Sequence, residues 1–291
     1  MRERGLAAVR AAVEAAALPD DMPAMALIVD GTAPGPAGRI ALRTYRPTDD
    51  PTCPALVYFH GGGMVMGTNR SFEPLARSLA AASGAVVVAV EYRLAPESPP
   101  PAQFDDAYAA TAWVAANAAD LGIDADCLGV VGDSAGGSLA AAVALAARDG
   151  GGPRLCVQAL LYPGLDRDMA TPSITAMRDA PMLCHDDIVY MHELADCGMP
   201  PHDHYRVPAY AHDLSRLPPA IVVTGESDPI RDWGERYAAR LRDAGVQTTM
   251  TRYPGMYHGF LMRPEATARG RLAIAELGAL LKARFAHPVP L

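Results

Sequence analysis

Lysine is almost absent from this 291-residue chain, in which Lys282 is the one lysine among 25 basic residues. Acidic residues number 33, so the formal net charge is −8. This sign argues against partners that require a basic surface, namely nucleic acids and anionic membranes. The excess of arginine over lysine indicates the coding bias of an alanine- and arginine-rich proteome, and we attach no functional meaning to it.

Cysteine is also scarce, and its pattern argues against two further classes of protein. The five cysteines are odd in number and include no Cys-x-x-Cys pair, so neither a disulfide framework nor a zinc knuckle is expected. No apolar run approaches the roughly 18 residues of a membrane-spanning helix. Near the N-terminus, Leu6, Val9, Val13 and Ala17 share one helical face, which predicts an amphipathic helix and not a signal peptide. We therefore expect a soluble, cytoplasmic protein.

What the sequence does contain is a series of short, continuous apolar runs, typical of strands buried on both faces. The clearest are Ala55–Phe59, Ala85–Glu91, Leu128–Gly132, Cys156–Leu161 and Ala220–Gly225. Helical patterns alternate with them, over about 72–83, 102–119, 134–148, 232–244 and 265–286. This alternation predicts an α/β fold with a mostly parallel sheet. Two earlier runs, Ala26–Asp30 and Arg39–Tyr45, are candidates for an antiparallel edge.

One region breaks the alternation. From about 166 to 217 the chain is rich in Pro, Met, His and Asp, and it contains helical pieces but no convincing strand. Since it falls between two strong strand signals, we expect an insertion above the sheet, which together with residues 1–38 forms a helical cap. No repeat or linker divides the chain, so residues 1–291 are expected to form a single domain.

A candidate nucleophile follows the run Leu128–Gly132. The segment Gly132–Gly137 reads Gly-Asp-Ser-Ala-Gly-Gly and leads into an alanine-rich helix, the strand–turn–helix setting of a nucleophile elbow with Ser134 at its tip. The alternative is a glycine-rich turn in which Ser134 merely caps the helix. The position of the motif directly after a strand favours the nucleophile.

A second motif, His-Gly-Gly-Gly at His60–Gly63, follows the run Ala55–Phe59. Three successive glycines allow a loop to present backbone amides, which can hold the oxyanion of a tetrahedral intermediate. A phosphate-binding loop is the rival interpretation, but no Lys-Ser/Thr pair follows the glycines. We expect the ring of His60 to brace the loop and not to act as a base.

A nucleophilic serine needs a base and an acid that orients the base, and in this fold they come later in the chain in the order acid, then histidine. Asp228 follows the run Ala220–Gly225, and His258 follows the expected strand Val246–Tyr253. Glu226 and Asp232 are competing acids. The remaining histidines, at 185, 192, 202, 204, 212 and 287, do not follow strands. Their spacing resembles no known zinc motif, so we expect no metal and interpret the cluster as a solvated surface.

Taken together, these motifs resemble the hormone-sensitive-lipase-like branch of the α/β-hydrolase superfamily, the bacterial HGGG esterases. The resemblance rests on His60–Gly63, Glu91–Glu97, Gly132–Gly137, Asp228-Pro229 and His258–Phe260. It implies an eight-stranded α/β-hydrolase sheet with helices on both faces, a cap, no cofactor, and hydrolysis of short-chain or small-metabolite carboxylic esters. It also implies catalytic residues Ser134, Asp228 and His258, oxyanion donors at the amides of Gly61, Gly62 and Ala135, and a homodimer formed through the C-terminal strand and helix.

Three positions depart from the usual family pattern. Met64 stands where Trp commonly follows the glycines, Ser138 replaces a common Asn, and Trp233 replaces a common Glu. Met64, together with Tyr162, is the candidate substrate-binding residue, because methionine is adaptable where tryptophan is rigid. Two other functions stay open on the same scaffold: a metabolite-tailoring acyltransferase or lyase, and a non-catalytic receptor for a small ligand.

Overall fold

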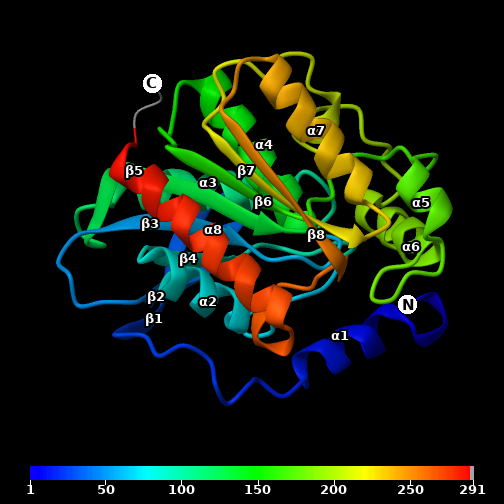
Figure 1. Cartoon of the computed structure of the whole chain (residues 1–291), viewed down its shortest axis with the longest axis horizontal. Helices are drawn as coiled ribbons and strands as arrows, with labels where there is room; N and C mark the ends of the chain where they lie inside the picture. The colour runs from blue at the N-terminus through cyan, green and yellow to red at the C-terminus, as the bar shows by residue number, and fades with distance from the viewer. Residues whose placement is uncertain (289–291) are drawn as a thin grey trace.

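An eight-stranded sheet with the order β1-β2-β4-β3-β5-β6-β7-β8 forms the centre of the protein (Figure 1). The computed structural model describes residues 1–288, so the last three residues of the predicted domain lie outside the described chain. The strands are β1 Leu27–Gly35, β2 Gly38–Arg46, β3 Cys53–Phe59, β4 Val86–Glu91, β5 Ile123–Asp133, β6 Val157–Leu161, β7 Ala220–Ser227 and β8 Thr248–Tyr257. The pairs β1–β2 and β2–β4 are antiparallel, and all other pairs are parallel. The sheet is therefore mostly parallel with an antiparallel edge, as the sequence predicts.

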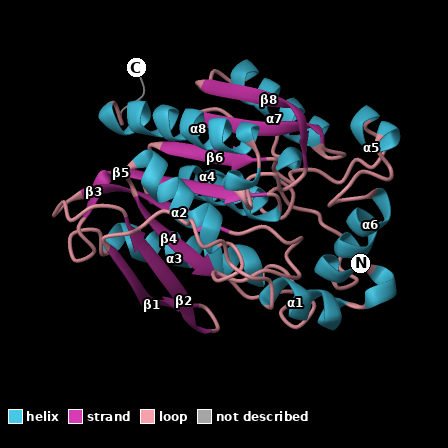
Figure 2. Ribbon diagram, turned by 60° about the horizontal axis from the view of Figure 1, so that its bottom comes forward, coloured by secondary structure: helices cyan, strands magenta, loops and turns pink. Residues whose placement is uncertain are grey.

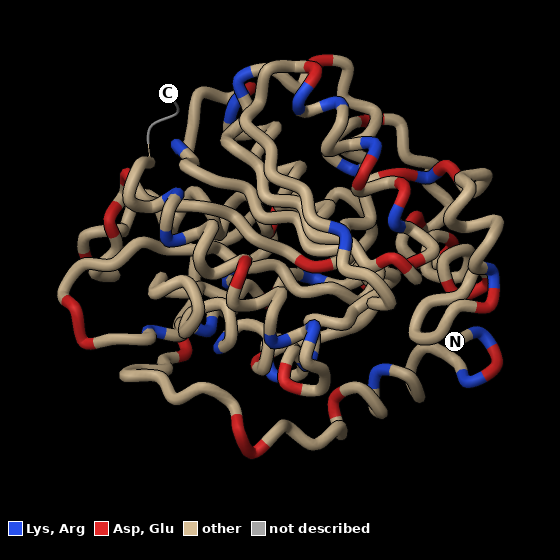
Figure 3. The backbone as a smooth tube through the Cα atoms, in the orientation of Figure 1, with Lys and Arg blue, Asp and Glu red and all other residues tan. Residues whose placement is uncertain are grey.

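Helices cover both faces of the sheet. They are α2 Glu73–Ser83, α3 Ala102–Ala116, α4 Ala135–Gly150, α7 Arg231–Asp243 and α8 Ala268–Ala286. Side chains of α3, α4 and α7 share one apolar core with the sheet, whereas α2 and α8 pack into the core on the opposite face. The central strands carry few charged residues, which gather instead on helices and loops (Figure 3). This burial on both faces is why the strands appear in the sequence as unbroken apolar runs.

Three other helices lie together at one end of the sheet, beside the carboxyl ends of the parallel strands (Figure 2). They are α1 Leu6–Glu14, α5 Pro172–Ala176 and α6 His185–Asp196. Arg10 of α1 donates to the carbonyl oxygens of Val65 and Ala95, at 2.6 and 2.7 Å, and so fastens the helix to loops at this end. Residues 27–35 belong to the sheet as β1, so the N-terminal segment outside the sheet is shorter than the predicted 1–38.

Within residues 1–288, no helix is both long and apolar enough to span a bilayer.

Candidate active site

Ser134 lies at the turn between β5 and α4, with φ 52° and ψ −118°. A non-glycine residue in this region is strained by about 1–3 kcal/mol, so surrounding contacts must hold it there. The Ser134 amide donates to the carbonyl of Leu161 at 2.8 Å, and its carbonyl accepts from the Gly164 amide at 2.9 Å. These two bonds fix the turn against the chain that follows β6 and direct the side chain away from the strand.

The glycines on either side of Ser134 allow this turn to pack without a gap. A Cβ atom added to Gly132 would lie 2.1 Å from the carbonyl oxygen of Gly136, and one added to Gly136 would lie 1.9 Å from the carbonyl oxygen of Phe59. Both distances are far below van der Waals contact, and both involve backbone atoms. The first turn of α4 therefore lies directly on the end of β3, which no larger residue would permit.

Three side chains far apart in the sequence form one hydrogen-bonded chain at the carboxyl edge of the sheet. Ser134 Oγ lies 2.8 Å from His258 Nε2, and His258 Nδ1 lies 2.9 Å from Asp228 Oδ2. Asp228 is fully buried, and its second oxygen accepts the Ile230 amide at 2.9 Å. An imidazole held between a hydroxyl and a buried carboxylate can take the hydroxyl proton while the carboxylate stabilises the resulting imidazolium.

The two competing acids are occupied elsewhere. Glu226 is exposed and accepts the amide of Gly255 at 2.8 Å. Asp232 pairs with Arg231 and accepts the amide of Ser173 at 2.8 Å. Asp228 is therefore the acid that lies against His258.

In the glycine loop after β3, the amide of Gly61 already has a hydrogen-bond partner inside the protein. The Gly61 amide donates to Asp133 Oδ1 at 2.9 Å, and Gly61 is buried. Because a backbone amide has a single hydrogen, the prediction of Gly61 as an oxyanion donor is wrong. Gly62 and Gly63 have φ of 110° and 65°, are partly exposed, and make no amide hydrogen bond within residues 1–288. The free amides are thus one residue further along the loop than the sequence suggested.

Two buried side chains hold this loop. Asp133 Oδ1 accepts the Gly61 amide and also the Tyr58 hydroxyl at 2.7 Å, while burial raises the pKa of Asp133 to about 7. The His60 ring is stacked on the ring of Tyr92 with centroids 4.4 Å apart, and burial lowers the pKa of His60 to about 4. His60 is consequently uncharged at neutral pH, and its ring packs beneath the loop.

Of the two predicted substrate-binding residues, Met64 lines the cavity beside Ser134 and Tyr162 does not. Met64, with φ 65°, lines a cavity of about 100 Å³ that also exposes Ser134, Ala135 and Gly63. Tyr162 does not line this cavity. Its ring is 1% exposed and meets the His258 ring edge-on at 5.2 Å, so it supports the imidazole from below. The prediction of Tyr162 as a substrate contact is wrong, because the chain turns inward after β6 and buries the side chain.

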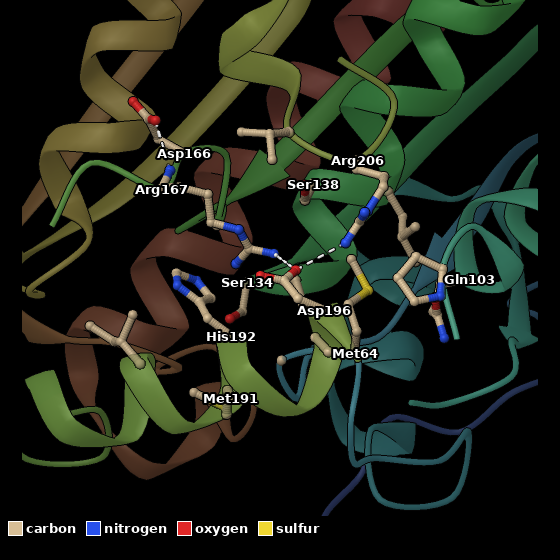
Figure 4. Close-up of a pocket in the computed structure, with 18 of the residues that line it drawn as sticks. Met64, Gln103, Ser134, Ser138, Asp166, Arg167, Met191, His192, Asp196 and Arg206 are labelled. Atoms are coloured by element: carbon tan, nitrogen blue, oxygen red, sulfur yellow. Dashed lines mark hydrogen bonds and ion pairs between the residues drawn. The ribbon is translucent and has the colours of Figure 1, made fainter. Parts of the chain in front are cut away.

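The cavity wall is formed largely by residues that the sequence did not single out (Figure 4). Apolar side chains come from α6 and the segment before it, and from α7, and include Leu183, Ile188, Met191 and Trp233. Arg167, His192, Asp196 and Arg206 form a polar side of the same wall. They are spread over the irregular region 166–217, where no periodic pattern marks which side chains face inward. The three residues that depart from the family pattern all line this cavity; they are Met64, Ser138 and Trp233.

The histidines of this region do not assemble into a metal site. Within residues 1–288, no group of three or more His, Cys, Asp or Glu side chains is arranged to hold a metal ion. His204 lies 3.6 Å from Asp149 and packs on the ring of Tyr205, while His192 is stacked on Trp233 with centroids 5.9 Å apart.

Known proteins share this architecture. A protein-family profile described as the alpha/beta hydrolase fold matches residues 56–262. Carboxylesterase NlhH of Mycobacterium tuberculosis is 44% identical over 232 residues, which cover 76% of this chain and 73% of that protein. The arylesterase of Saccharolobus solfataricus is 36% identical over 255 residues, covering 84% of this chain and 80% of that protein. A solved esterase of Pyrobaculum calidifontis has a TM-score of 0.90 and 38% identity, covering 97% of this chain and 95% of that one.

The sheet, with its strained serine between β5 and α4, defines an α/β hydrolase. Within that superfamily, the chain belongs to the hormone-sensitive-lipase-like esterase family and is a carboxylesterase-type hydrolase.

Proposed function

We propose that this carboxylesterase works through a Ser134–His258–Asp228 triad and a covalent acyl-enzyme. The observation that carries the proposal is the unbroken hydrogen-bonded chain, with 2.8 Å between Ser134 Oγ and His258 Nε2 and 2.9 Å between His258 Nδ1 and Asp228 Oδ2. Both contacts have the length that proton transfer and orientation of the base require.

In the first half of the reaction, Ser134 Oγ attacks the ester carbonyl carbon while His258 Nε2 accepts the hydroxyl proton. Asp228 accepts a hydrogen bond from the Nδ1–H group of the ring, which fixes the tautomer with Nε2 free and stabilises the imidazolium. When the tetrahedral intermediate collapses, the bond to the alkoxy group breaks and His258 donates its proton to the leaving alcohol. Water then repeats these steps on the acyl-enzyme, which releases the free acid and restores Ser134.

The negative charge on the carbonyl oxygen requires amide donors. We assign this role to the amides of Gly62, Gly63 and Ala135. Gly62 and Gly63 are partly exposed and free of other acceptors within residues 1–288, whereas Ala135 begins α4, where amides lack partners inside the helix and the helix dipole favours negative charge. Losing one such donor typically lowers kcat about 10²–10³-fold.

Residues 166–217 and the N-terminal helix α1 serve, in this proposal, as a cap over the site. Contacts support it: Arg2 pairs with Glu193 of α6 at 2.5 Å, and α6 contributes Ile188 and Met191 to the cavity wall. A cavity of about 100 Å³ favours esters with small acyl or alcohol groups. The substrates are accordingly short-chain or small-metabolite esters.

A fluorophosphonate probe tests the nucleophile. We expect stoichiometric labelling, with the mass shift located by peptide sequencing on Ser134, because the probe reacts with a serine that a base has activated. In parallel, short-chain nitrophenyl and alkyl esters should yield the free acid, carrying one ¹⁸O atom when the reaction is run in labelled water. Labelling of another residue contradicts the triad. Transfer of the acyl group without release of acid, or elimination, favours the tailoring alternative.

We also infer a homodimer and a cytoplasmic location. β8 lies at the edge of the sheet and, within the described chain, pairs only with β7, so its outer backbone can pair with a second copy. All five cysteines are unpaired, as in proteins of reducing compartments. Light scattering should give twice the 30.6 kDa mass of the chain. A constant monomer mass across concentrations contradicts the dimer.

A further inference from the structure

Two arginines meet one carboxylate on the wall of the cavity that holds Ser134 (Figure 4). Arg167 follows β6, Asp196 is the last residue of α6, and Arg206 lies in the loop before β7. Both guanidinium groups donate to the same oxygen, Asp196 Oδ1, at 3.1 and 3.0 Å. Their side chains are mostly buried, with exposed fractions of 24% for Arg167 and 14% for Arg206.

The three side chains Arg167, Asp196 and Arg206 together carry a net charge of +1. His192, which lies beside the cluster, is uncharged at neutral pH, because burial and the neighbouring Arg167 lower its pKa to about 3. Asp166, the other acid on the wall, balances the charge of the whole lining, but its Oδ1 accepts the amides of Arg167 and Asp168 and its carboxylate points away from the cluster (Figure 4). In the described chain, every other residue that lines the cavity is uncharged.

The cluster also has hydrogen-bond donors to spare. Arg167 makes a single side-chain hydrogen bond within residues 1–288, although a guanidinium has five N–H groups; its Nε is buried without a partner, and 24% of the side chain is exposed, so terminal N–H groups remain for a ligand. Burial lowers the pKa of Arg167, and the charge of Arg206 acts in the same direction. A buried guanidinium with unmet donors is costly unless an anion completes its coordination.

A purely structural ion pair in this protein is built differently. Arg93 donates to both oxygens of Asp106, each at 2.8 Å, so that one guanidinium is matched by one carboxylate in a bidentate pair. In the cavity, by contrast, two guanidinium groups share one oxygen. Two arginines, Arg43 and Arg77, also meet one carboxylate at Glu73, away from the cavity, but there they approach different oxygens.

We propose that the substrates are esters that carry a separate carboxylate, which Arg167 and Arg206 bind beside the apolar wall. This inference rests on the proposed function, since it concerns the substrate of the same site. The class comprises short monoesters of dicarboxylic acids and acyl esters of hydroxy acids, depending on which side of the ester bond reaches the arginines. Guanidinium groups suit this ligand because their planar fork matches a carboxylate. The carboxylate takes no part in bond breaking, and the products are an acid and an alcohol as before.

The test compares neutral and anionic esters of nearly equal shape. Monoethyl adipate is paired with ethyl hexanoate, and 4-acetoxybutanoate with butyl acetate, with acid release followed by titration at constant pH. We expect kcat/KM of the wild-type protein to favour at least one anionic ester over its neutral partner by about 10- to 100-fold. The pair that shows the preference identifies the side of the ester that lies near the arginines.

Variants locate the source of this preference. Arg167→Met leaves Arg206 and Asp196 as a balanced pair and should reduce the ratio of anionic to neutral kcat/KM about 10-fold or more, with Arg167→Lys restoring part of it. Arg236→Met is the matched control, because Arg236 pairs with Asp168 at 2.8 Å away from the cavity and is 49% exposed, so this ratio should stay unchanged. Should Arg167→Met fail to fold, the comparison of ester pairs on the wild-type protein decides.

The outcomes separate the two proposals. A wild-type protein that hydrolyses the neutral esters at least as well as the anionic ones overturns the carboxylate preference and leaves the triad intact. A ratio that is unchanged in Arg167→Met also overturns it. If no ester is hydrolysed and the fluorophosphonate probe leaves Ser134 unlabelled, the proposed function itself has failed.

Discussion

Replacement of Ser134 by alanine should lower kcat for a short-chain nitrophenyl ester by about 10⁶-fold while leaving the fold intact. The nucleophilic oxygen is lost, and His258 has no hydroxyl left to activate, so only the amide donors and substrate binding remain to assist attack by water. The turn itself does not depend on the hydroxyl, because the Ser134 amide and carbonyl are held by Leu161 and Gly164. Thermal unfolding of the variant should therefore match that of the wild-type protein.

Asp228→Asn is the companion variant. The amide keeps the size of the carboxylate but favours the wrong tautomer of His258, and a loss of about 10⁴-fold in kcat is expected. Steady-state kinetics on both variants, with circular dichroism as the control for folding, measures these effects. Equal turnover by wild-type protein and Ser134→Ala contradicts the assignment of the nucleophile.

Replacement of Gly136 by alanine should strongly destabilise the protein, although it adds only one methyl group. The new Cβ would lie 1.9 Å from the carbonyl oxygen of Phe59, and a backbone atom cannot rotate away as a side chain can. Either α4 separates from β3 or the turn at Ser134 changes shape. We expect the free energy of unfolding to fall by about 3 kcal/mol or more, with loss of esterase activity, because overpacking commonly costs 1–3 kcal/mol where side chains can adjust.

The same helix offers a matched control. Gly150 is the last residue of α4, and a Cβ added there would lie 3.5 Å from the Tyr108 hydroxyl oxygen, which is ordinary contact. Gly150→Ala should stay within about 1 kcal/mol of wild-type stability and lie on the favourable side, since alanine is the better helix former. Urea unfolding of the two variants compares them directly. Wild-type stability and activity in Gly136→Ala would contradict the close packing of β3 and α4.

The order of strands and helices could be predicted from the sequence, because strands that are buried on both faces appear as continuous apolar runs. The expected runs Ala55–Phe59 and Ala220–Gly225 lie within β3 and β7, and the expected antiparallel edge is present as β1 and β2. The expected strand Leu128–Gly132 is longer in the structure, because β5 begins at Ile123 and includes the half-buried Asp124 and the exposed Asp126. Polar residues at the exposed start of a strand carry no apolar signal.

By itself, the sequence determined the chain positions at which strands end in chemically useful residues. Parallel strands share one carboxyl edge, so Ser134, Asp228 and His258 could be expected to meet there from their places after strand signals. Only the tertiary structure decided which amide of the glycine loop is free, because that depends on Asp133, a residue 72 positions away that takes the Gly61 amide. It also decided that Tyr162 turns inward and that Arg167 and Arg206 converge on Asp196. Such contacts join irregular segments, in which no period of 2 or 3.6 residues marks the inward side, and so they arise only when the chain has folded.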